Sequence, residues 1–312
     1  MSREKGRDRV FNQKMLSQQK SEMLLAAVIL ARSTSFVLSK SAMNSLTPFN
    51  LLAVRFLTAF VFLAILFGKK LIHIHRQELK YGFLLGVLFT IMMGCELTGL
   101  RATDSGTTSF IENSAMIFVP ILQFVIFQKK LKGADAARIA LAVFGIAFLT
   151  LGASGGLLRS GCVYLLGSAI FYASAILLTN IASRKGDPLM IGITQVFTIG
   201  FLSLVLSFIL EQPRLPQTGS EWGMILGLAV ICSGFGFTLQ PVAQRGTTAE
   251  RAGMMCALSP LSASLQGIII LNDQMSFSKL AGCIMILLSL LVPVLLQSLH
   301  KPLTRRPVYT HS

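Results

Sequence analysis

Runs of apolar residues long enough to cross a lipid bilayer fill most of this chain. Each run holds roughly 20 residues, the length that a helix needs to span the hydrocarbon layer. Because lipid offers no hydrogen-bond partners to the backbone, such runs fold as helices. The ten runs lie at residues 23–43, 49–67, 81–100, 107–127, 134–152, 160–181, 189–210, 222–241, 252–271 and 277–297. We therefore expect an all-α integral membrane protein with ten transmembrane helices.

The positive charges provide an independent test of this count. Of the 28 lysines and arginines, 21 fall in the two tails and in every second connection, whereas the other connections hold five. Positively charged loops stay in the cytoplasm. The distribution predicts a multi-pass protein of the cell membrane with both termini in the cytoplasm. The net charge of +15 is spread over these loops without a nucleic-acid-binding motif, so lipid headgroups rather than nucleic acids are the expected partner.

Two halves of the chain repeat each other at a distance of 140 residues. Leu46-Thr47-Pro48 and Gly186-Asp187-Pro188 each place a proline before an apolar run, and Gly106-Thr107-Thr108 recurs as Gly246-Thr247-Thr248. If each half holds five crossings, an odd number, the second half enters the membrane from the opposite side. Inverted repeats of this kind are typical of transporters, whose site lies between the halves near the bilayer midplane. The predicted units are a tail at 1–22, repeats at 23–152 and 153–297, and a tail at 298–312.

Four charged residues lie inside predicted crossings, and all four belong to the first repeat. They are Arg32, Arg55, Glu96 and Glu112. A charge within the membrane costs a few kcal/mol on insertion scales, so an intramembrane charge is a functional candidate. These residues either neutralise one another as ion pairs or bind the carboxylate and ammonium groups of a zwitterionic substrate.

The second repeat has no charge at the matching depths. At the 140-residue offset, Tyr172 corresponds to Arg32 and Gln195 to Arg55. Asn113 follows Glu112 in a polar notch of an otherwise apolar run. A carboxyl group removed from water favours its protonated form, which makes protons a candidate coupling ion unless Arg55 holds Glu112 ionised. The predicted substrate-binding residues are Arg32, Arg55, Glu96, Glu112, Asn113, Tyr172 and Gln195.

Several short motifs, in their order and spacing, resemble those of the EamA-type family of the drug/metabolite transporter superfamily. The motifs are Thr47-Pro48-Phe49 with Leu52–Phe56, Gly99–Gly106, Phe171-Tyr172-Ala173 and Leu258-Ser259-Pro260, and the likeness spans roughly residues 23 to 297. The resemblance implies a bundle of two inverted five-helix repeats that moves small organic molecules by alternating access, often outward. We expect export of an amino-acid-like or zwitterionic metabolite. The alternatives are an exporter of lipophilic cations or drugs, and a non-transporting scaffold or sensor.

Enzymatic chemistry is not expected. Gly152-Ala153-Ser154-Gly155 resembles the G-x-S-G motif of intramembrane serine proteases, but all four histidines lie in a cytoplasmic loop or the C-terminal tail, out of reach of Ser154. A serine nucleophile needs its base within hydrogen-bond distance. The five cysteines form no C-x-x-C pair, so neither a metal site nor a cofactor is predicted. Because one chain holds both halves of its bundle, a functional monomer is the simpler expectation, with a weak homodimer as the alternative.

Overall fold

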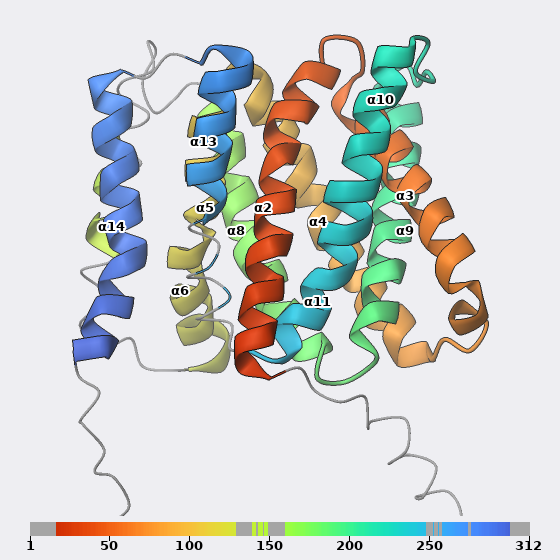
Figure 1. Cartoon of the computed structure of the whole chain (residues 1–312), viewed down its shortest axis with the longest axis horizontal. Coiled ribbons are helices and arrows are strands. Elements are labelled where there is room, and N and C mark those ends of the chain that lie inside the picture. Colours follow the sequence, from red (N-terminus) through yellow and green to blue (C-terminus); the bar gives the residue numbers. More distant parts are fainter. Residues whose placement is uncertain are drawn as a thin grey trace, which may run out of the picture.

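The computed structural model describes residues 17–128, 160–247, 258–273 and 276–299, together with residues 139–141, 143–145, 147–148, 252 and 255. Every regular element in these ranges is a helix (Figure 1). The helices are α2 (Gln18–Ala42), α3 (Pro48–Leu71), α4 (Arg76–Ala102), α5 (Ser105–Asn113), α6 (Ala115–Phe127), α8 (Ser160–Ala182), α9 (Pro188–Leu210), α10 (Gly219–Gly227), η1 (Leu228–Phe237), α11 (Thr238–Arg245), α13 (Leu258–Leu271) and α14 (Phe277–Leu299).

Within the described ranges, seven helical stretches are long and apolar enough to cross a membrane. They are α2, α3, α4, α5 with α6, α8, α9, and the continuous stretch from α10 through η1 to α11. They correspond to the first four predicted crossings and to the sixth, seventh and eighth. Two shorter apolar stretches are also described, Leu258–Leu271 of α13 and Leu280–Ser289 of α14. The count of ten stays a prediction, because most of the expected fifth crossing, the Gly152–Gly155 motif and residues 1–16 and 300–312 lie outside the described residues.

The repeat-related prolines both begin helices. Pro48 is the first residue of α3 and Pro188 the first of α9. A proline fits this position because its fixed φ suits the helix and its missing N–H would have no partner there. Asp187 adds a cap by accepting a hydrogen bond from the backbone N–H of Leu189 at 2.9 Å.

Two predicted crossings are not continuous α-helices. The fourth ends its first segment at Asn113 and resumes at Ala115. The eighth contains a π-helix, η1, which is followed by α11 with Pro241 inside it. Pro241 has no N–H to donate to the carbonyl of Phe237, so the regular hydrogen-bond ladder is interrupted there. Interruptions of this kind occur where a helix lines a site.

Several contacts between the two halves of the chain occur twice, and in the second contact the helices of the two halves have changed roles. The contact of α4 with α8 has its counterpart in that of η1 with α2. In the same way, the contact of α4 with α9 matches that of η1 with α3, and the contact of α6 with α8 matches that of α13 with α2. Helices α3 and α9 pack on each other. In Figure 1 the connection from α2 to α3 lies at the upper end of the bundle, whereas that from α8 to α9 lies at the lower end. Helix α2 begins, and α14 ends, at the lower end.

Glycines allow the two halves to approach closely. A Cβ added at Gly82 or Gly86 of α4 would collide with the side chain of Thr194 or Thr198 on α9. A Cβ at Gly192 of α9 would lie 2.7 Å from the carbonyl oxygen of Thr238. Small residues at such interfaces are what lets helices associate in lipid, where apolar surface alone gives no driving force between them.

Candidate functional site

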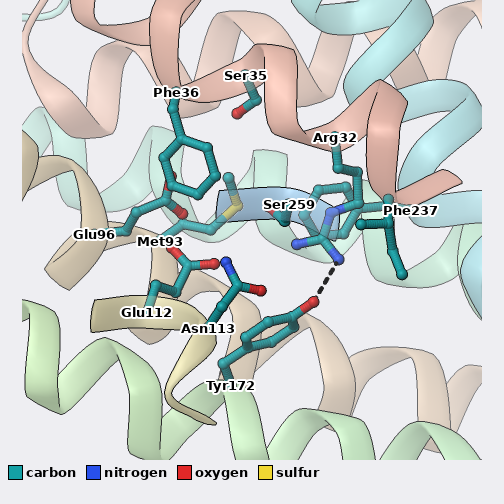
Figure 2. Close-up of a pocket in the computed structure, with 11 residues that line it drawn as sticks. Arg32, Ser35, Phe36, Met93, Glu96, Glu112, Asn113, Tyr172, Phe237 and Ser259 are labelled. Carbon is teal, nitrogen blue, oxygen red and sulfur yellow. Dashed lines mark hydrogen bonds between the residues drawn. The ribbon is translucent and has the colours of Figure 1, made fainter. Parts of the chain in front are cut away.

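A pocket lies inside the bundle, between helices of both halves (Figure 2). The space between its lining atoms is about 370 Å³, a volume that includes open solvent. Its walls come from α2, α4 and α5 of the first half and from α8, η1 and α13 of the second. The lining residues are Ile29, Arg32, Ser35, Phe36, Met93, Glu96, Glu112, Asn113, Tyr172, Phe237 and Ser259. The part of this space that the centre of a water-sized sphere can reach is about 20 Å³, so the pocket is narrow in this conformation.

Arg32 of α2 forms one end of the pocket. Its Nη1 donates hydrogen bonds to Gln240 Oε1 at 2.5 Å and to Tyr172 Oη at 3.3 Å. Its guanidinium carbon lies 4.1 Å from the ring centre of Phe237 and 5.8 Å from that of Phe89. Aromatic faces attract a cation without neutralising it. Polar and aromatic groups of both halves therefore contact Arg32, which lines the pocket.

Glu96 of α4 and Glu112 of α5 form the opposite end. Each side chain is only 3% exposed, and their carboxyl groups lie within hydrogen-bonding reach of each other. Figure 2 shows both side chains reaching into the pocket, Glu96 beside Met93 and Glu112 beside Asn113. Glu112 Oε2 is buried and has no hydrogen-bond partner. A buried acceptor of this kind is costly unless a ligand or a proton satisfies it, so this end of the pocket is suited to bind a cationic group.

The break between α5 and α6 places polar groups between these two ends. Asn113 is the last residue of α5, and its Nδ2 donates to the carbonyl of Ser109 at 2.8 Å. The hydroxyl of Ser109 lies 3.5 Å from that of Ser259 on α13. These contacts join the first half of the chain to the second beside the carboxyl pair. They also hold the interrupted helix so that Glu112 and Asn113 face the pocket.

Arg55 of α3 does not line the pocket, which differs from the sequence-based expectation. The residue is 0% exposed, and its Nε donates to Ser233 Oγ at 2.6 Å. Its Nη1 donates to Ser35 Oγ at 3.1 Å and to Ser39 Oγ at 3.5 Å, while Nη2 has no partner. Serine hydroxyls therefore surround this cation, and no carboxylate of the described residues forms an ion pair with it.

Gln195 also lies away from the pocket wall. It is buried on α9 with its Oε1 unpartnered, at a position related by the repeat to Arg55. Arg55 and Gln195 belong to α3 and α9, two helices that pack on each other. The structure thus brings five of the seven expected residues together, namely Arg32, Glu96, Glu112, Asn113 and Tyr172.

Sequence reasoning did not include Gln240, Phe237 and Phe89 among the site residues. Gln240 carried a usable signal, because it is an amide next to Pro241 inside an apolar run. The two phenylalanines carried none, since 22 phenylalanines are spread over the chain. Within the described ranges, no group of three or more His, Cys, Asp or Glu side chains converges to hold a metal ion.

Comparisons with known proteins agree with this architecture. The model of the EamA-like transporter family matches residues 19–151 and 159–295. An uncharacterized transporter of Archaeoglobus fulgidus is 25% identical over 279 residues, which cover 87% of this chain and 85% of that protein. The uncharacterized transporter YoaV of Bacillus subtilis is 22% identical and covers 84% of this chain and 92% of its own length. One solved structure shares the fold, with a TM-score of 0.68 at 18% identity over 91% of this chain and 100% of that one. The chain is a membrane transporter that belongs to the EamA-like transporter family.

Proposed function

We propose that this protein exports a small zwitterionic, amino-acid-like metabolite across the cell membrane by alternating access. The observation that carries the proposal is the placement of a guanidinium at one end of a single pocket and two carboxyl groups at the other. A zwitterion carries the complementary pair of charges. Metabolites with one charge would leave one end of the pocket without a partner.

The pocket offers each part of such a molecule a distinct surface. A substrate carboxylate accepts hydrogen bonds from Arg32, whose fork-shaped guanidinium suits planar anions. The substrate ammonium donates to Glu112 Oε2, the buried oxygen that has no partner. Ile29, Phe36 and Met93 provide apolar walls for the remaining carbon atoms. Asn113 and Ser259 add neutral polar groups between the charged ends.

Alternating access requires two halves that move against each other. The exchange of helix contacts between the halves supports a ten-helix bundle of two inverted repeats. A further pair of contacts supports it: Lys40 donates to the carbonyl of Thr103 at 2.6 Å, and Asn180, 140 residues later, donates to the carbonyl of Thr247 at 3.3 Å. Because the bundle contains its own two halves, the proposed unit is a monomer.

The orientation of the bundle follows from its charged end. Lys69 and Lys70 lie in the last turn of α3 and Arg245 in that of α11, and both helices end at the lower end of the bundle in Figure 1. This end also holds the start of α2 and the end of α14. The positive-inside rule supports a cytoplasmic location for this end and for both termini.

Proton coupling is a further part of the proposal. A hydrogen bond between Glu96 and Glu112 requires one proton, because a carboxylate has no donor. A substrate ammonium that binds to this pair displaces the proton, so proton and substrate occupy the same groups in turn. Exchange of a cytoplasmic substrate for an external proton then follows from competition at one site.

A lipophilic cation is the second candidate substrate, favoured by the carboxyl pair and the aromatic rings of Phe36 and Phe237. The test uses purified protein in proteoliposomes loaded with a panel of zwitterionic, cationic and anionic compounds. We expect saturable counterflow of zwitterions and faster export when the outside is acidic. Counterflow of cations alone would replace the proposed substrate class, and absence of counterflow with every compound would favour the non-transporting alternative.

A further inference from the structure

Two glutamates fasten the halves of the bundle to each other at its opposite ends. Glu211, at the end of α9, binds the first turn of α3. Glu78, in the first turn of α4, binds the loop before α9. The first contact joins the second half to the first at the upper end of the bundle, and the other joins the first half to the second at the lower end (Figure 1).

The upper contact is an anion bound at a helix N-terminus. Glu211 accepts hydrogen bonds from the backbone N–H of Phe49 at 3.1 Å and of Asn50 at 2.9 Å, and from the hydroxyl of Thr47 at 2.5 Å. The first turn of a helix has N–H groups without partners and a partial positive charge. Thr47 itself makes no capping hydrogen bond to α3. A side chain from the other half of the protein therefore supplies the cap of this helix.

The lower contact uses the repeat-related loop. Glu78 Oε1 accepts a hydrogen bond from the backbone N–H of Asp187 at 3.0 Å, and its Oε2 accepts one from the N–H of His75 at 2.9 Å. A Cβ added at Gly186 would lie 3.0 Å from Glu78 Cγ. Glycine at this position lets the Glu78 side chain approach the loop before α9. Pro48 and Pro188 thus both begin helices whose N-terminal region is bound by a glutamate of the opposite half.

We propose that Glu211 and Glu78 are the gating residues of this transporter, with Glu211 closing the outer end of the pocket and Glu78 the inner end. A rotation of one half against the other that opens the upper end separates α3 from the end of α9, and so breaks the three hydrogen bonds of Glu211. Opening of the lower end separates α4 from the loop before α9, and so breaks the contact of Glu78 with Asp187. Each carboxylate therefore sets the free energy of one of the two open states.

The inference rests on the proposed alternating access, but not on the identity of the substrate. Its test measures from which side a residue of the pocket is reached. All five cysteines are first replaced, and Ser259, which lines the pocket, is changed to cysteine. A membrane-impermeant thiol reagent is then added to right-side-out and to inside-out vesicles, and the labelling rates are compared.

We expect Glu211→Gln to raise the labelling rate from the outside several-fold and to lower it from the inside. Glu78→Gln should have the reverse effect. Glu22→Gln is the control for the loss of a carboxylate charge, because Glu22 lies in the first turns of α2 and bonds to Gln18 of the same helix. Its labelling should equal that of the parent protein.

The possible outcomes separate the two proposals. If the parent protein is labelled from one side only, alternating access fails. If the parent is labelled from both sides and the two variants leave the ratio of rates unchanged, the gating role fails. A similar rise from both sides in either variant would also overturn the gating role, since it would indicate general loosening of the bundle.

Discussion

Arg32 and Tyr172, which occupy the same position in the two repeats, meet in the pocket through a hydrogen bond of 3.3 Å. The ring centre of Tyr172 also lies 5.4 Å from the guanidinium carbon of Arg32. If the halves are inverted repeats, as proposed, related positions meet only where they lie close to the two-fold axis between the halves. This contact therefore places the site at the seam between the halves, where one repeat contributes a charge and the other an uncharged residue.

The charge of Arg32 should select for substrates with an anionic group. Arg32→Ala removes charge-assisted hydrogen bonds worth about 1.5–3 kcal/mol, so the dissociation constant of a zwitterion should rise by about 10- to 150-fold. The affinity for a cation of the same size should not fall. Binding of matched compounds to purified protein in detergent, measured by calorimetry, checks this difference. Equal losses for both compounds would remove Arg32 from the substrate site, and Arg101→Ala, at the exposed end of α4, is the control.

Glu112 should couple transport to the proton gradient. Glu112→Gln keeps the size of the side chain but removes a carboxyl group of the pair, so proton and substrate no longer compete. Export driven by a pH gradient should fall to the rate seen without a gradient. Counterflow of substrate should continue, at lower affinity. Both rates are measured in the same proteoliposomes, and Glu22→Gln in the first turns of α2 serves as the control. Gradient-driven export that persists in Glu112→Gln would exclude this residue as the proton site.

Two glycines should respond oppositely to the addition of one methyl group. Gly192→Ala places a Cβ 2.8 Å from the Cα of Thr238, where only backbone could move away. The resulting overpacking should cost about 1–3 kcal/mol and lower the melting temperature in detergent. Gly223 of α10 has nothing within 4 Å of an added Cβ, so Gly223→Ala should stabilise the helix by about 0.5–1 kcal/mol. Differential melting of the two purified variants checks both signs.

The serines around Arg55 should contribute to the stability of the protein only while the guanidinium of Arg55 is present. Ser233→Ala leaves the Nε of Arg55 without its 2.6 Å partner in a fully buried place, which should cost about 1–3 kcal/mol. In an Arg55→Met background the same substitution should cost much less. The four melting temperatures of this double-mutant cycle give the coupling. Additive losses would show that the hydroxyl does not serve the guanidinium.

Much of the architecture could be predicted from the sequence because its physical causes are local. Lipid cannot hydrogen-bond the backbone, so each apolar run of sufficient length becomes a helix. Pro48 and Pro188 mark helix starts by their fixed φ. The break after Asn113 in the fourth crossing and the π-helix in the eighth were not predicted. Asn113 and Pro241 hinted at them, but a polar residue or a proline occurs in continuous membrane helices as well.

The residues of the candidate site were likewise only partly predictable from the sequence. The sequence identified Arg32, Glu96 and Glu112 as candidates because they are charged residues inside membrane-spanning runs. The free-energy cost of a charge in lipid is high whichever helices become its neighbours. Which charges meet depends on helix rotation and on which helices become neighbours. Only the packed bundle therefore separated Arg55, surrounded by serines, from Arg32, which faces the pocket.

By itself, the sequence determined that the chain crosses the membrane many times, that it repeats itself at 140 residues and that its interior charge lies in one repeat. These properties depend on composition and order along the chain. Only the tertiary structure decided that Gln240 and Phe237 complete the surroundings of Arg32 and that Glu211 and Glu78 each bind the opposite half. These contacts join residues more than 100 positions apart, and no local pattern records them, because they arise from the side-by-side packing of helices.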